Sequence, residues 1–568
     1  MAEVDLIIRN GTVIDGTGGP VCVADLAVHD GFIVGVGTIS GTATRVVDAA
    51  GATVAPGFVD IHTHYDGQAT WDERLTPSSW HGVTTVVMGN CGVGFAPVRR
   101  RDHSRLIELM EGVEDIPGAA LHEGLSWQWE SFAEYLDALE SRPHDIDLAA
   151  QVPHGALRLY VMGDRGARRE PASDDEIELM GRLAAEAVTA GALGFTTSRT
   201  LNHRTSTGEP TPTLTAARAE LVGIARAIGA TGRGVLQVVS DFLDFDDEIG
   251  TLRAMAEVSG RPVSISIAQH PRAPLHYRRL LASIAEANAD GFTMRAQVAA
   301  RGIGVLVGLA GTVNPWRRCP TYRRFAAERN ESLLASLMTP QVRTKILAEY
   351  PGHRDPLLVD FQRVFVLGDQ PDYEPDPESS VGARAAREGR SAEEVMYDLL
   401  LADQGRALLY LPVLNYADGN LDAVAEMLAD PYAVPGLSDG GAHVGTICDG
   451  SFPTTLLAHW GRDRHRGPLF DLAWLISRQS RATAEAVGLL DRGIIAPGMR
   501  ADLNVIDLDR LGLDPPRMAY DLPAGGKRLL QRAHGYRHTF VAGVEVYHDG
   551  EPTGALPGRL VRGPQEPR

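Results

Sequence analysis

Lysine is almost missing from this chain of 568 residues. The combined count of lysine and arginine is 54, yet only Lys345 and Lys527 are lysines. Arginine therefore carries nearly all of the positive charge. A mechanism that requires a lysine in the core has almost no candidate residue.

Basic surface is also scarce, because 73 acidic residues give a formal net charge of −19. Nucleic acids and anionic membranes bind basic surfaces, so neither is an expected partner. No apolar run approaches the length that spans a bilayer. The acidic start, Met1 to Asp5, leads directly into a strand and shows no secretory signal. We therefore expect a cytoplasmic protein that acts on a small-molecule substrate.

The four cysteines are widely separated in the sequence. Such spacing is typical of thiols in a reducing compartment and provides no disulfide framework. Hydrophobic residues make up 44% of the chain and aromatic residues 6%, which suits a folded protein. The length exceeds that of one ordinary core, so we expect two or more domains.

The most informative stretch is residues 57–64, GFVDIHTH. It reads as a short buried strand, because it is mostly apolar and a Pro-Gly pair marks its start. Alternate residues of a strand point to the same side, so His62 and His64 would present two imidazoles together. Neutral imidazole is the commonest metal ligand, and such a pair is half of a zinc site. The alternative is a strand end whose histidines only form hydrogen bonds, and for a His-x-His pair we favour metal.

Both ends of the chain contain short β segments separated by turn signals such as Asn10-Gly11. The first 56 residues are too few for an independent sandwich. Further β segments at 501–507 and 539–547 offer partners for them. We therefore expect residues 1–56 and 485–568 to form one small β-sandwich domain.

The centre of the chain alternates strands and helices, which predicts a parallel sheet. About eight such units fit within residues 57–484, so the expected class is α/β, with a (β/α)8 TIM-like barrel. A charged helical segment at about 320–405 is expected to be an insertion that could cover the site. Residues 174–190 form an amphipathic helix with an acidic start. The expected barrel strands are 57–61, 82–88, 147–152, 191–195, 234–239, 263–267, 304–309 and 434–439.

Polar residues at the carboxyl ends of barrel strands form the site in such folds. Four residues stand at such ends, namely His62, Cys91, His154 and Asp439. Two of them have ordinary structural alternatives when taken alone. Cys91 would serve as a small buried hydrophobe, and Asp439 as a helix N-cap. Together with the histidine pair, they favour a metal site.

These features resemble the amidohydrolase superfamily, which has an early His-x-His strand, a late strand ending in aspartate and a split β domain. More narrowly, segments along nearly the whole chain resemble the N-acyl-D-amino-acid deacylase (D-aminoacylase) family. These segments are 82–92 (GVTTVVMGNCG), 95–97 (FAP), 114–117 (EDIP), 127–132 (WQWESF), 190–194 (AGALG) and 491–498 (DRGIIAPG).

The resemblance implies a zinc-dependent hydrolase of amide C–N bonds. His62 and His64 match the family's His-x-His ligands, Cys91 its bridging thiolate, and Asp439 its catalytic aspartate. Zinc takes all of these ligands and lowers the pKa of bound water toward neutrality. Asp439 would then act as general base and as general acid. Many members of the superfamily use a carbamylated lysine as the bridge, and here Cys91 would fill that place.

The fifth and sixth strands depart from the family, in which histidines at their ends hold a second metal. Neither strand ends in histidine here, and His270 comes later than the family position. We therefore expect one zinc in preference to two. Gln237, Gln269 and His270 are taken as candidate residues of the substrate site.

The stretches that hold the substrate carboxylate in the family correspond to 268–270 and 447–450, and neither contains arginine or lysine. Carboxylate recognition favours a guanidinium fork, so a simple N-acyl-D-amino acid fits poorly as substrate. Four other residues are candidates for substrate binding, each with a structural hydrogen-bonding role as an equal alternative. They are His154, Arg199, His203 and His443.

Two alternatives to the hydrolase remain open. One is a catalytically weak binding protein with the amidohydrolase fold, and the other is a metal-dependent lyase or decarboxylase. The missing histidines favour the binding protein, whereas the four retained metal-site residues favour the hydrolase. The identity and stereochemistry of the substrate stay open, as does association into a homo-oligomer.

Overall fold

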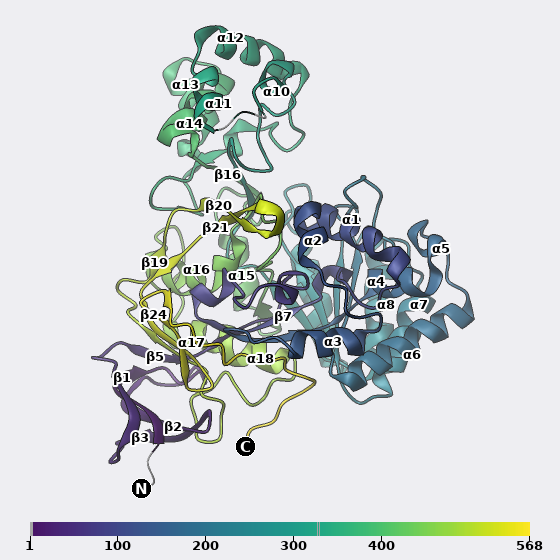
Figure 1. Cartoon of the computed structure of the whole chain (residues 1–568), viewed down its shortest axis with the longest axis vertical. Coiled ribbons are helices and arrows are strands. Elements are labelled where there is room, and N and C mark those ends of the chain that lie inside the picture. Colours follow the sequence, from purple (N-terminus) through teal and green to yellow (C-terminus); the bar gives the residue numbers. More distant parts are fainter. Residues whose placement is uncertain (1–3, 327, 329) are drawn as a thin grey trace.

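The computed structural model describes residues 4–326, 328 and 330–568. The chain folds into a central barrel, a β sheet built from both chain ends, and a helical lobe that projects from the barrel (Figure 1). The predicted class, an α/β barrel with a terminal β-sandwich sheet, is confirmed. Within the described residues, no helix has both the length and the apolar character that crossing a bilayer requires. The domain boundaries at residues 56 and 484 stay predictions.

Parallel strands fill eight positions around the barrel. The third position is shared by two short strands in succession, β8 and β9. The barrel strands are β6 (Phe58–Asp60), β7 (Val83–Met88), β8 (Asp147–Ala150), β9 (Val152–Pro153), β10 (Gly194–Arg199), β11 (Val235–Ser240), β12 (Val263–Ile267), β13 (Met294–Val298) and β17 (Ala433–Pro435).

The barrel closes where the segment after β6 meets the segment after β17. The backbone N–H of His64 donates to the carbonyl of Gly440 at 2.8 Å, and that of Asp439 donates to the carbonyl of His62 at 3.1 Å. This closure brings residues from the two ends of the barrel sequence into direct contact. It therefore positions the candidate ligands.

The seventh barrel strand is β13, so the expected strand at 304–309 is wrong. β14 (Ile303–Val307) instead runs antiparallel to β16 (Leu409–Leu414), which also pairs with β15 (Phe365–Val366). β14 and β16 are both short apolar runs, and the local sequence pattern does not determine which strand each one pairs with. Pairing with β12 on one side and β17 on the other places β13 in the barrel.

The helix α6 (Asp174–Ala190) has the bounds that the sequence predicts. The Ser173 side chain accepts the N–H of Glu176, and the Glu176 carboxylate accepts the N–H of Ser173 in return, which forms a capping box. Gly191 ends the helix at a φ of +126°. The other helices around the barrel are α1 (His103–Glu114), α2 (Gly118–Gly124), α3 (Phe132–Glu140), α4 (His154–Met162), α5 (Asp164–Ala167), α7 (Arg218–Gly229), α8 (Phe245–Ser259), α9 (His276–Ala289), α15 (Asp422–Ala429), α16 (Phe452–Ala458), α17 (Leu472–Ser477) and α18 (Thr483–Ala486).

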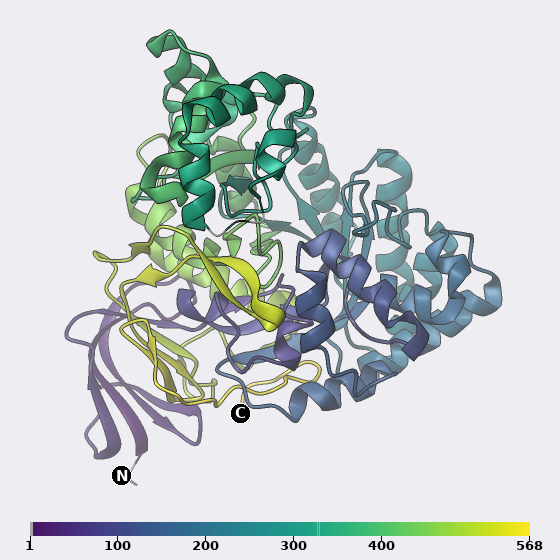
Figure 2. The same ribbon diagram turned by 45° about the horizontal axis from the view of Figure 1, so that its top comes forward.

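The two chain ends share one sheet, with strand order β25-β24-β23-β18-β5-β1-β2-β3 and β4 paired to β1. Figure 2 shows the N-terminal strands in purple beside the C-terminal strands in yellow. The pairing of β5 with both β1 and β18 joins the two ends. The strands are β1 (Val4–Val13), β2 (Cys22–His29), β3 (Phe32–Gly37), β4 (Ala43–Asp48), β5 (Thr53–Pro56), β18 (Leu503–Ile506), β23 (Tyr536–Val541), β24 (Val544–His548) and β25 (Glu551–Pro552).

The helical lobe contains α10 (Pro320–Arg323), α11 (Asn330–Leu337), α12 (Pro340–Glu349), α13 (Val381–Glu388) and α14 (Ala392–Gly405). It has its own buried core, in which Trp316 packs against Tyr350 and Tyr397. Near its base, the hydroxyl of Thr312 donates to Asp115 at 3.2 Å, directly after α1. The lobe therefore begins at the edge of the barrel's site.

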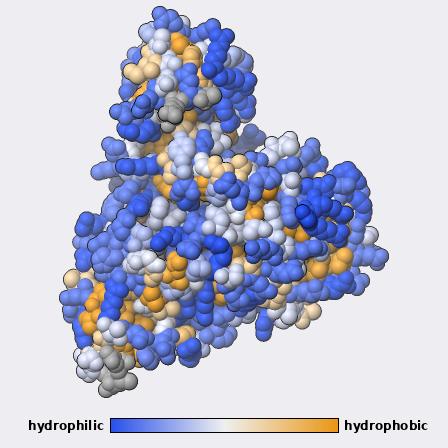
Figure 3. All heavy atoms as spheres, viewed as in Figure 1, coloured by the Kyte–Doolittle hydropathy of each residue, from blue (hydrophilic) through white to orange (hydrophobic). Residues whose placement is uncertain are grey.

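The outer surface is mostly hydrophilic in the view of Figure 3, with apolar residues gathered at the lower left. The terminal sheet lies in that region (Figure 1). Its exposed apolar side chains include Val23 and Val36, which are 80% and 38% exposed. A homo-oligomer stays a prediction.

Candidate metal centre

His62 and His64 follow β6 and are buried, with 1% and 0% exposure. Between them, the backbone N–H of Thr63 donates to the carbonyl of Val87 in β7 at 3.1 Å, which extends the strand pairing. Alternation along the strand turns the two imidazoles to the same side. Their ring centroids lie 5.6 Å apart.

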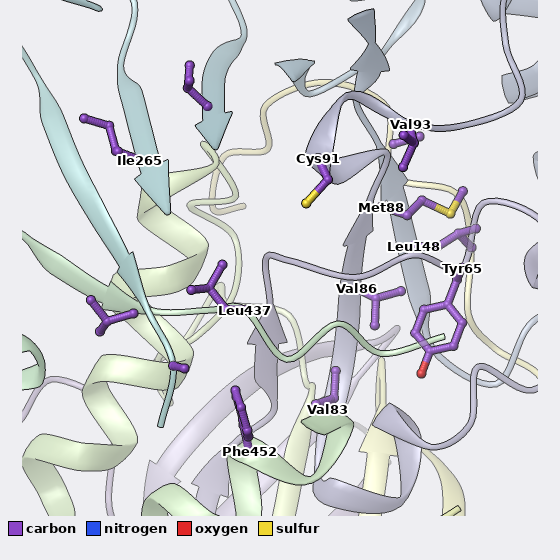
Figure 4. Close-up of a cluster of buried hydrophobic side chains, with 14 of the residues drawn as sticks. Tyr65, Val83, Val86, Met88, Cys91, Val93, Leu148, Ile265, Leu437 and Phe452 are labelled. Atoms are coloured by element: carbon purple, nitrogen blue, oxygen red, sulfur yellow. The ribbon is translucent and has the colours of Figure 1, made fainter. Parts of the chain in front are cut away.

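Cys91 stands in the turn after β7, where the backbone has little freedom. Gly89 and Cys91 both adopt left-handed conformations, with φ of +85° and +54°. A side chain at Gly89 would lie 2.2 Å from the carbonyl oxygen of Gln151, so glycine is required. The hydroxyl of Thr196 in β10 also donates to the Gly89 carbonyl. Figure 4 shows the sulfur of Cys91 directed into the barrel, away from Val93.

Asp439 lies beyond β17 in a segment with unusual backbone angles. Leu437, Asp439 and His443 have φ of +59°, +47° and +47°. Such conformations cost about 1–3 kcal/mol each in non-glycine residues and gather at functional sites. The hydroxyl of Ser438 anchors the segment by donating to Asp60 at 2.5 Å.

The four candidate ligands meet inside the barrel. His62 Nε2 lies 3.4 Å from Cys91 Sγ and 3.4 Å from Asp439 Oδ1. His64 Nε2 lies 3.7 Å from the same carboxylate oxygen. The ligand atoms of His62, His64 and Cys91 are all within 4.8 Å of one another.

The second nitrogen of each imidazole faces a hydrogen-bond acceptor. His62 Nδ1 lies 2.7 Å from Gln297 Oε1, and His64 Nδ1 lies 3.4 Å from Glu114 Oε1. For His62, the acceptor at Nδ1 holds the proton there and leaves the lone pair on Nε2. The Nε2 atoms of both histidines face Asp439 Oδ1, which is the arrangement a shared metal ion requires.

Burial governs the charges of these groups. It lowers the pKa of His62 and His64 from their usual value, which favours the neutral form that binds a metal. Burial, followed by the charges of Glu114 and Asp439, raises the pKa of the Cys91 thiol well above its usual value. Burial also raises the pKa of Asp439, but His64 and His62 outweigh it and hold that pKa well below its usual range. The carboxylate therefore stays ionised.

This donor set fits zinc, which binds imidazole, thiolate and carboxylate. Zinc bonds of about 2.0–2.3 Å place tetrahedral ligands about 3.3–3.8 Å apart. The separations of His62 from Cys91 and from Asp439 are of this size. Both ring nitrogens of His64 are buried without a hydrogen-bond partner in the described part of the chain. A cation would give its Nε2 the partner that the protein does not supply.

Two more histidines from the sequence analysis lie beside the cluster. His443 Nε2 is 3.5 Å from Glu114 Oε2, and its side chain is 31% exposed. His203 bonds to Ser198 Oγ at 2.8 Å through Nδ1. Burial, with the nearby His443 and His64, lowers the pKa of His203 to about 3. Substrate contact by His443 and His203 stays a prediction.

His154 and Arg199 are engaged with other residues. His154 contacts Thr197 at 2.8 Å through Nδ1 and Glu220 at 2.9 Å through Nε2, which occupies both ring nitrogens. Arg199 forms a fork with Glu248, with N–O distances of 2.7 and 2.9 Å. These contacts support the structural alternative for both residues, and their role in substrate binding stays a prediction.

The remaining three candidates are also separate from the ligand cluster. Gln269 donates to Asp418 at 2.7 Å and ties β12 to a later loop. Gln237 donates to Ser266 at 3.1 Å, and its own oxygen is buried without a partner in the described residues. His270 is exposed. None of the hydrogen bonds between described residues joins these three to the ligands.

Sequence reasoning does not find Gln297 and Glu114. Gln297 belongs to β13, the barrel strand that the sequence analysis did not identify, where Arg295 and Gln297 alternate with apolar residues. Glu114 ends α1, and its signal was its place in the EDIP segment, which carried part of the family resemblance. Neither residue has a local pattern that reveals its contact with a histidine.

Comparisons with known proteins agree with the fold. The amidohydrolase family matches residues 45–547, nearly the whole chain. An N-acyl-D-glutamate deacylase from Alcaligenes xylosoxydans xylosoxydans is 28% identical over 570 residues, which cover 99% of this chain and 97% of the relative. A D-aminoacylase from the same organism is 40% identical over 194 residues, and this match spans only 34% of this chain and 37% of the relative.

Solved structures give the same answer. A D-aminoacylase variant in complex with copper chloride superimposes with a TM-score of 0.66 at 26% identity, covering 98% of this chain and 100% of that one. An N-acyl-D-glutamate deacylase from Bordetella bronchiseptica, complexed with zinc and a phosphonate inhibitor, has the same fold with a TM-score of 0.65 at 24% identity, and covers 99% of this chain and 100% of that one. The resemblance seen in the sequence is confirmed, and this chain belongs to the amidohydrolase family, with D-aminoacylase-like relatives along its full length.

Proposed function

We propose that this protein is a zinc-dependent amidohydrolase that cleaves the C–N bond of a small N-acyl or related substrate. The convergence of His62, His64, Cys91 and Asp439 is the observation that carries the proposal. A relative that matches over its full length is an N-acyl-D-glutamate deacylase, which supports an amide bond as the target.

Zinc bound by these residues would polarise the substrate carbonyl and lower the pKa of the attacking water. Asp439 is the residue suited to take a proton from that water, because its side chain is ionised and 18% exposed. The water oxygen joins the acyl carbon as the C–N bond breaks. Asp439 then passes the proton to the departing nitrogen, which leaves as an amine.

We propose a single resident ion. The segments β11 and β12 contain no histidine, and Gln237 on β11 is hydrogen-bonded to Ser266 on β12. A D-aminoacylase with the same fold is described as having a binuclear centre with one-metal activation and second-metal attenuation. That description supports a centre with one ion as a competent catalyst.

The substrate is proposed to be an acylated small molecule, and a free carboxylate is not required. Asp449, in one of the stretches that hold the carboxylate in the family, pairs with the buried Arg301 at 3.1 Å. That arginine is also bonded to Thr455, so it is engaged inside the protein. Neutral amides and cyclic amides therefore belong in a substrate panel beside N-acyl-D-amino acids.

The test is hydrolysis by protein stripped of metal with a chelator and reloaded with ZnCl2. The panel contains N-acyl-D-amino acids, their L enantiomers, N-acyl amines and hydantoins, with amine or ring-opened product as the readout. We expect activity that returns with about one zinc per chain. Two tightly bound zinc ions would contradict the single-ion centre, and activity that survives metal removal would contradict the metal role. Release of carbon dioxide would support the decarboxylase alternative. Bound zinc with neither hydrolysis nor carbon dioxide release from any panel member would support the binding-protein alternative.

A further inference from the structure

Glu114 is a buried carboxyl group to which the proposed reaction assigns no task. It is the last residue of α1, is 1% exposed, and has no hydrogen-bond partner for either oxygen among the described residues. In the described part of the chain, no arginine or lysine forms an ion pair with it. A carboxyl group in such a place is costly unless nearby groups use it.

Two imidazoles face this carboxyl group, one at each oxygen. His64 Nδ1 lies 3.4 Å from Oε1, and His443 Nε2 lies 3.5 Å from Oε2. The backbone N–H of His443 also donates to the carbonyl of Glu114. Glu114 therefore contacts a candidate metal ligand and the more exposed histidine beside it.

The end of α1 also holds the segment that carries Asp439. Asp115, which follows Glu114, accepts the backbone N–H of Gly445 at 3.2 Å. Gly445 comes two residues after His443. Asp115 has a left-handed φ of +52°, which ends the helix at that point. The position of the Glu114 carboxyl group is thus fixed by contacts on both sides.

The other ligand histidine has a comparable partner of a different kind. His62 Nδ1 faces the amide oxygen of Gln297, which serves one imidazole only. Outer partners of this kind fix the tautomer and orientation of a metal-binding histidine. Glu114 stands in that position for His64, and it contacts a second imidazole as well.

We propose that Glu114 is a positioning residue that acts through both histidines. It orients His64 with Nε2 toward the metal position, and it holds His443 with Nδ1 available to hydrogen-bond the substrate. This inference rests on the proposed function. It adds a residue that the four-ligand arrangement does not include.

The experiment uses the full chain and measures its affinity for ZnCl2 by chelator competition. Glu114→Met removes the carboxyl group while keeping the side-chain length, and we expect zinc to bind roughly 10–100-fold more weakly. Glu114→Gln is expected to lose less, because it keeps a side-chain oxygen beside His64, as Gln297 does for His62. The matched control is Glu108→Met, which changes an exposed residue of the same helix and should leave zinc affinity unchanged.

The melting temperature of the metal-free protein separates positioning from a merely structural role, which would move melting and leave zinc affinity unchanged. A folded Glu114→Met protein that binds zinc like the wild type overturns the inference. If that variant does not fold, Glu114→Gln decides. Unchanged zinc affinity, kcat and KM in Glu114→Gln would then overturn the inference, whereas a fall in affinity or in kcat supports it. A wild-type protein that takes up no zinc would instead overturn the proposed function itself.

Discussion

Two regions of the molecule place one glutamate between two histidines, yet the surroundings of the two clusters differ. In the barrel, the glutamate is buried at the end of a helix. In the terminal sheet, it belongs to β24, and its Oε1 is 2.5 and 3.0 Å from the two Nδ1 atoms, one on β23 and one on β24. The barrel cluster consists of His64, Glu114 and His443, and the sheet cluster consists of His538, Glu545 and His548.

The difference between the clusters is the counter-ion. Arg45, from β4, pairs with Glu545 and supplies a positive charge in the sheet cluster. Glu114 has no such partner among the described residues, and both of its oxygens lack hydrogen bonds. Ligand spacing alone marks both regions as able to hold a metal, through His62, His64 and Cys91 in the barrel and through His538, Glu545 and His548 in the sheet. The barrel cluster differs because its buried polar atoms lack hydrogen-bond partners, which a bound cation would supply.

The largest expected effect is on catalysis and comes from Asp439→Asn. An amide cannot accept the proton of the attacking water, so we expect kcat to fall about 10²–10⁴-fold. The measurement is amide hydrolysis at saturating zinc. Glu545→Gln is the control from the sheet cluster, and it should retain full activity. Activity that survives in Asp439→Asn would remove Asp439 as the general base.

The next effect is on metal affinity and comes from Cys91→Ser. A thiolate is a stronger zinc ligand than a hydroxyl, so we expect an affinity loss at least as large as the roughly 10–100-fold of an outer-shell change. Chelator competition measures it. Cys319→Ser changes a buried cysteine of the lobe and should leave zinc affinity unchanged. Equal affinities for the two variants would show that the thiol is not a ligand.

A smaller loss of zinc affinity, about tenfold, is expected from Gln297→Leu. This change removes the acceptor at His62 Nδ1 and frees the ring to rotate. The same substitution on a nearby barrel strand, Gln237→Leu, is the control, because Gln237 bonds to Ser266 and not to a ligand. Zinc titration of both variants compares them. A result in which Gln237→Leu loses as much as Gln297→Leu would contradict the assignment.

The smallest effect is expected from Glu545→Gln, and it concerns stability alone. Because Arg45 is 46% exposed, solvent screening limits the loss to about 1 kcal/mol of unfolding free energy. Burial raises the pKa of Glu545, but His538, Arg45 and His548 outweigh it and hold the pKa below 4.5. A carboxyl group with a depressed pKa stabilises the fold fully above its unfolded-state value, and this contribution is lost as pH falls through the folded-state pKa.

The measurement is urea unfolding of the wild type and of Glu545→Gln, from neutral pH down to pH values below 4.5. We expect the difference between the two proteins to be largest near neutral pH and to shrink in acid. Zinc affinity should be the same in both. A change in zinc affinity would mean that the sheet cluster also takes part in metal binding.

Much of the ligand set could be predicted from local pattern. A strand has a period of two, so the His-x-His sequence after β6 was sufficient to predict that His62 and His64 point the same way. The amphipathic pattern and acidic start of residues 174–190 likewise predicted α6, whose start the structure shows in a capping box. Such features depend on neighbours in the sequence, and for that reason sequence reasoning reaches them.

Partners from distant segments could not be predicted in this way. Arg199 had the character of a substrate-binding residue, but Glu248 of α8 takes its guanidinium. His154 is likewise held by Glu220 of α7. Segment 304–309 was predicted to be a barrel strand, but β14 in this region pairs with β16 instead. In each case the local sequence was compatible with several contacts, and the contact that forms depends on residues distant in the sequence.

The sequence by itself determined the types of ligand, the alternation of strands and helices, and the family to which the chain belongs. The first two follow from side-chain chemistry and from periodicity, which act over a few residues, and the family follows from the resemblance of segments along the chain. Only the tertiary structure decided that His64 would face Glu114, that Gln297 would support His62, and that Arg45 would neutralise Glu545. Those contacts depend on the tertiary fold, which brings together residues that are between 50 and 500 positions apart.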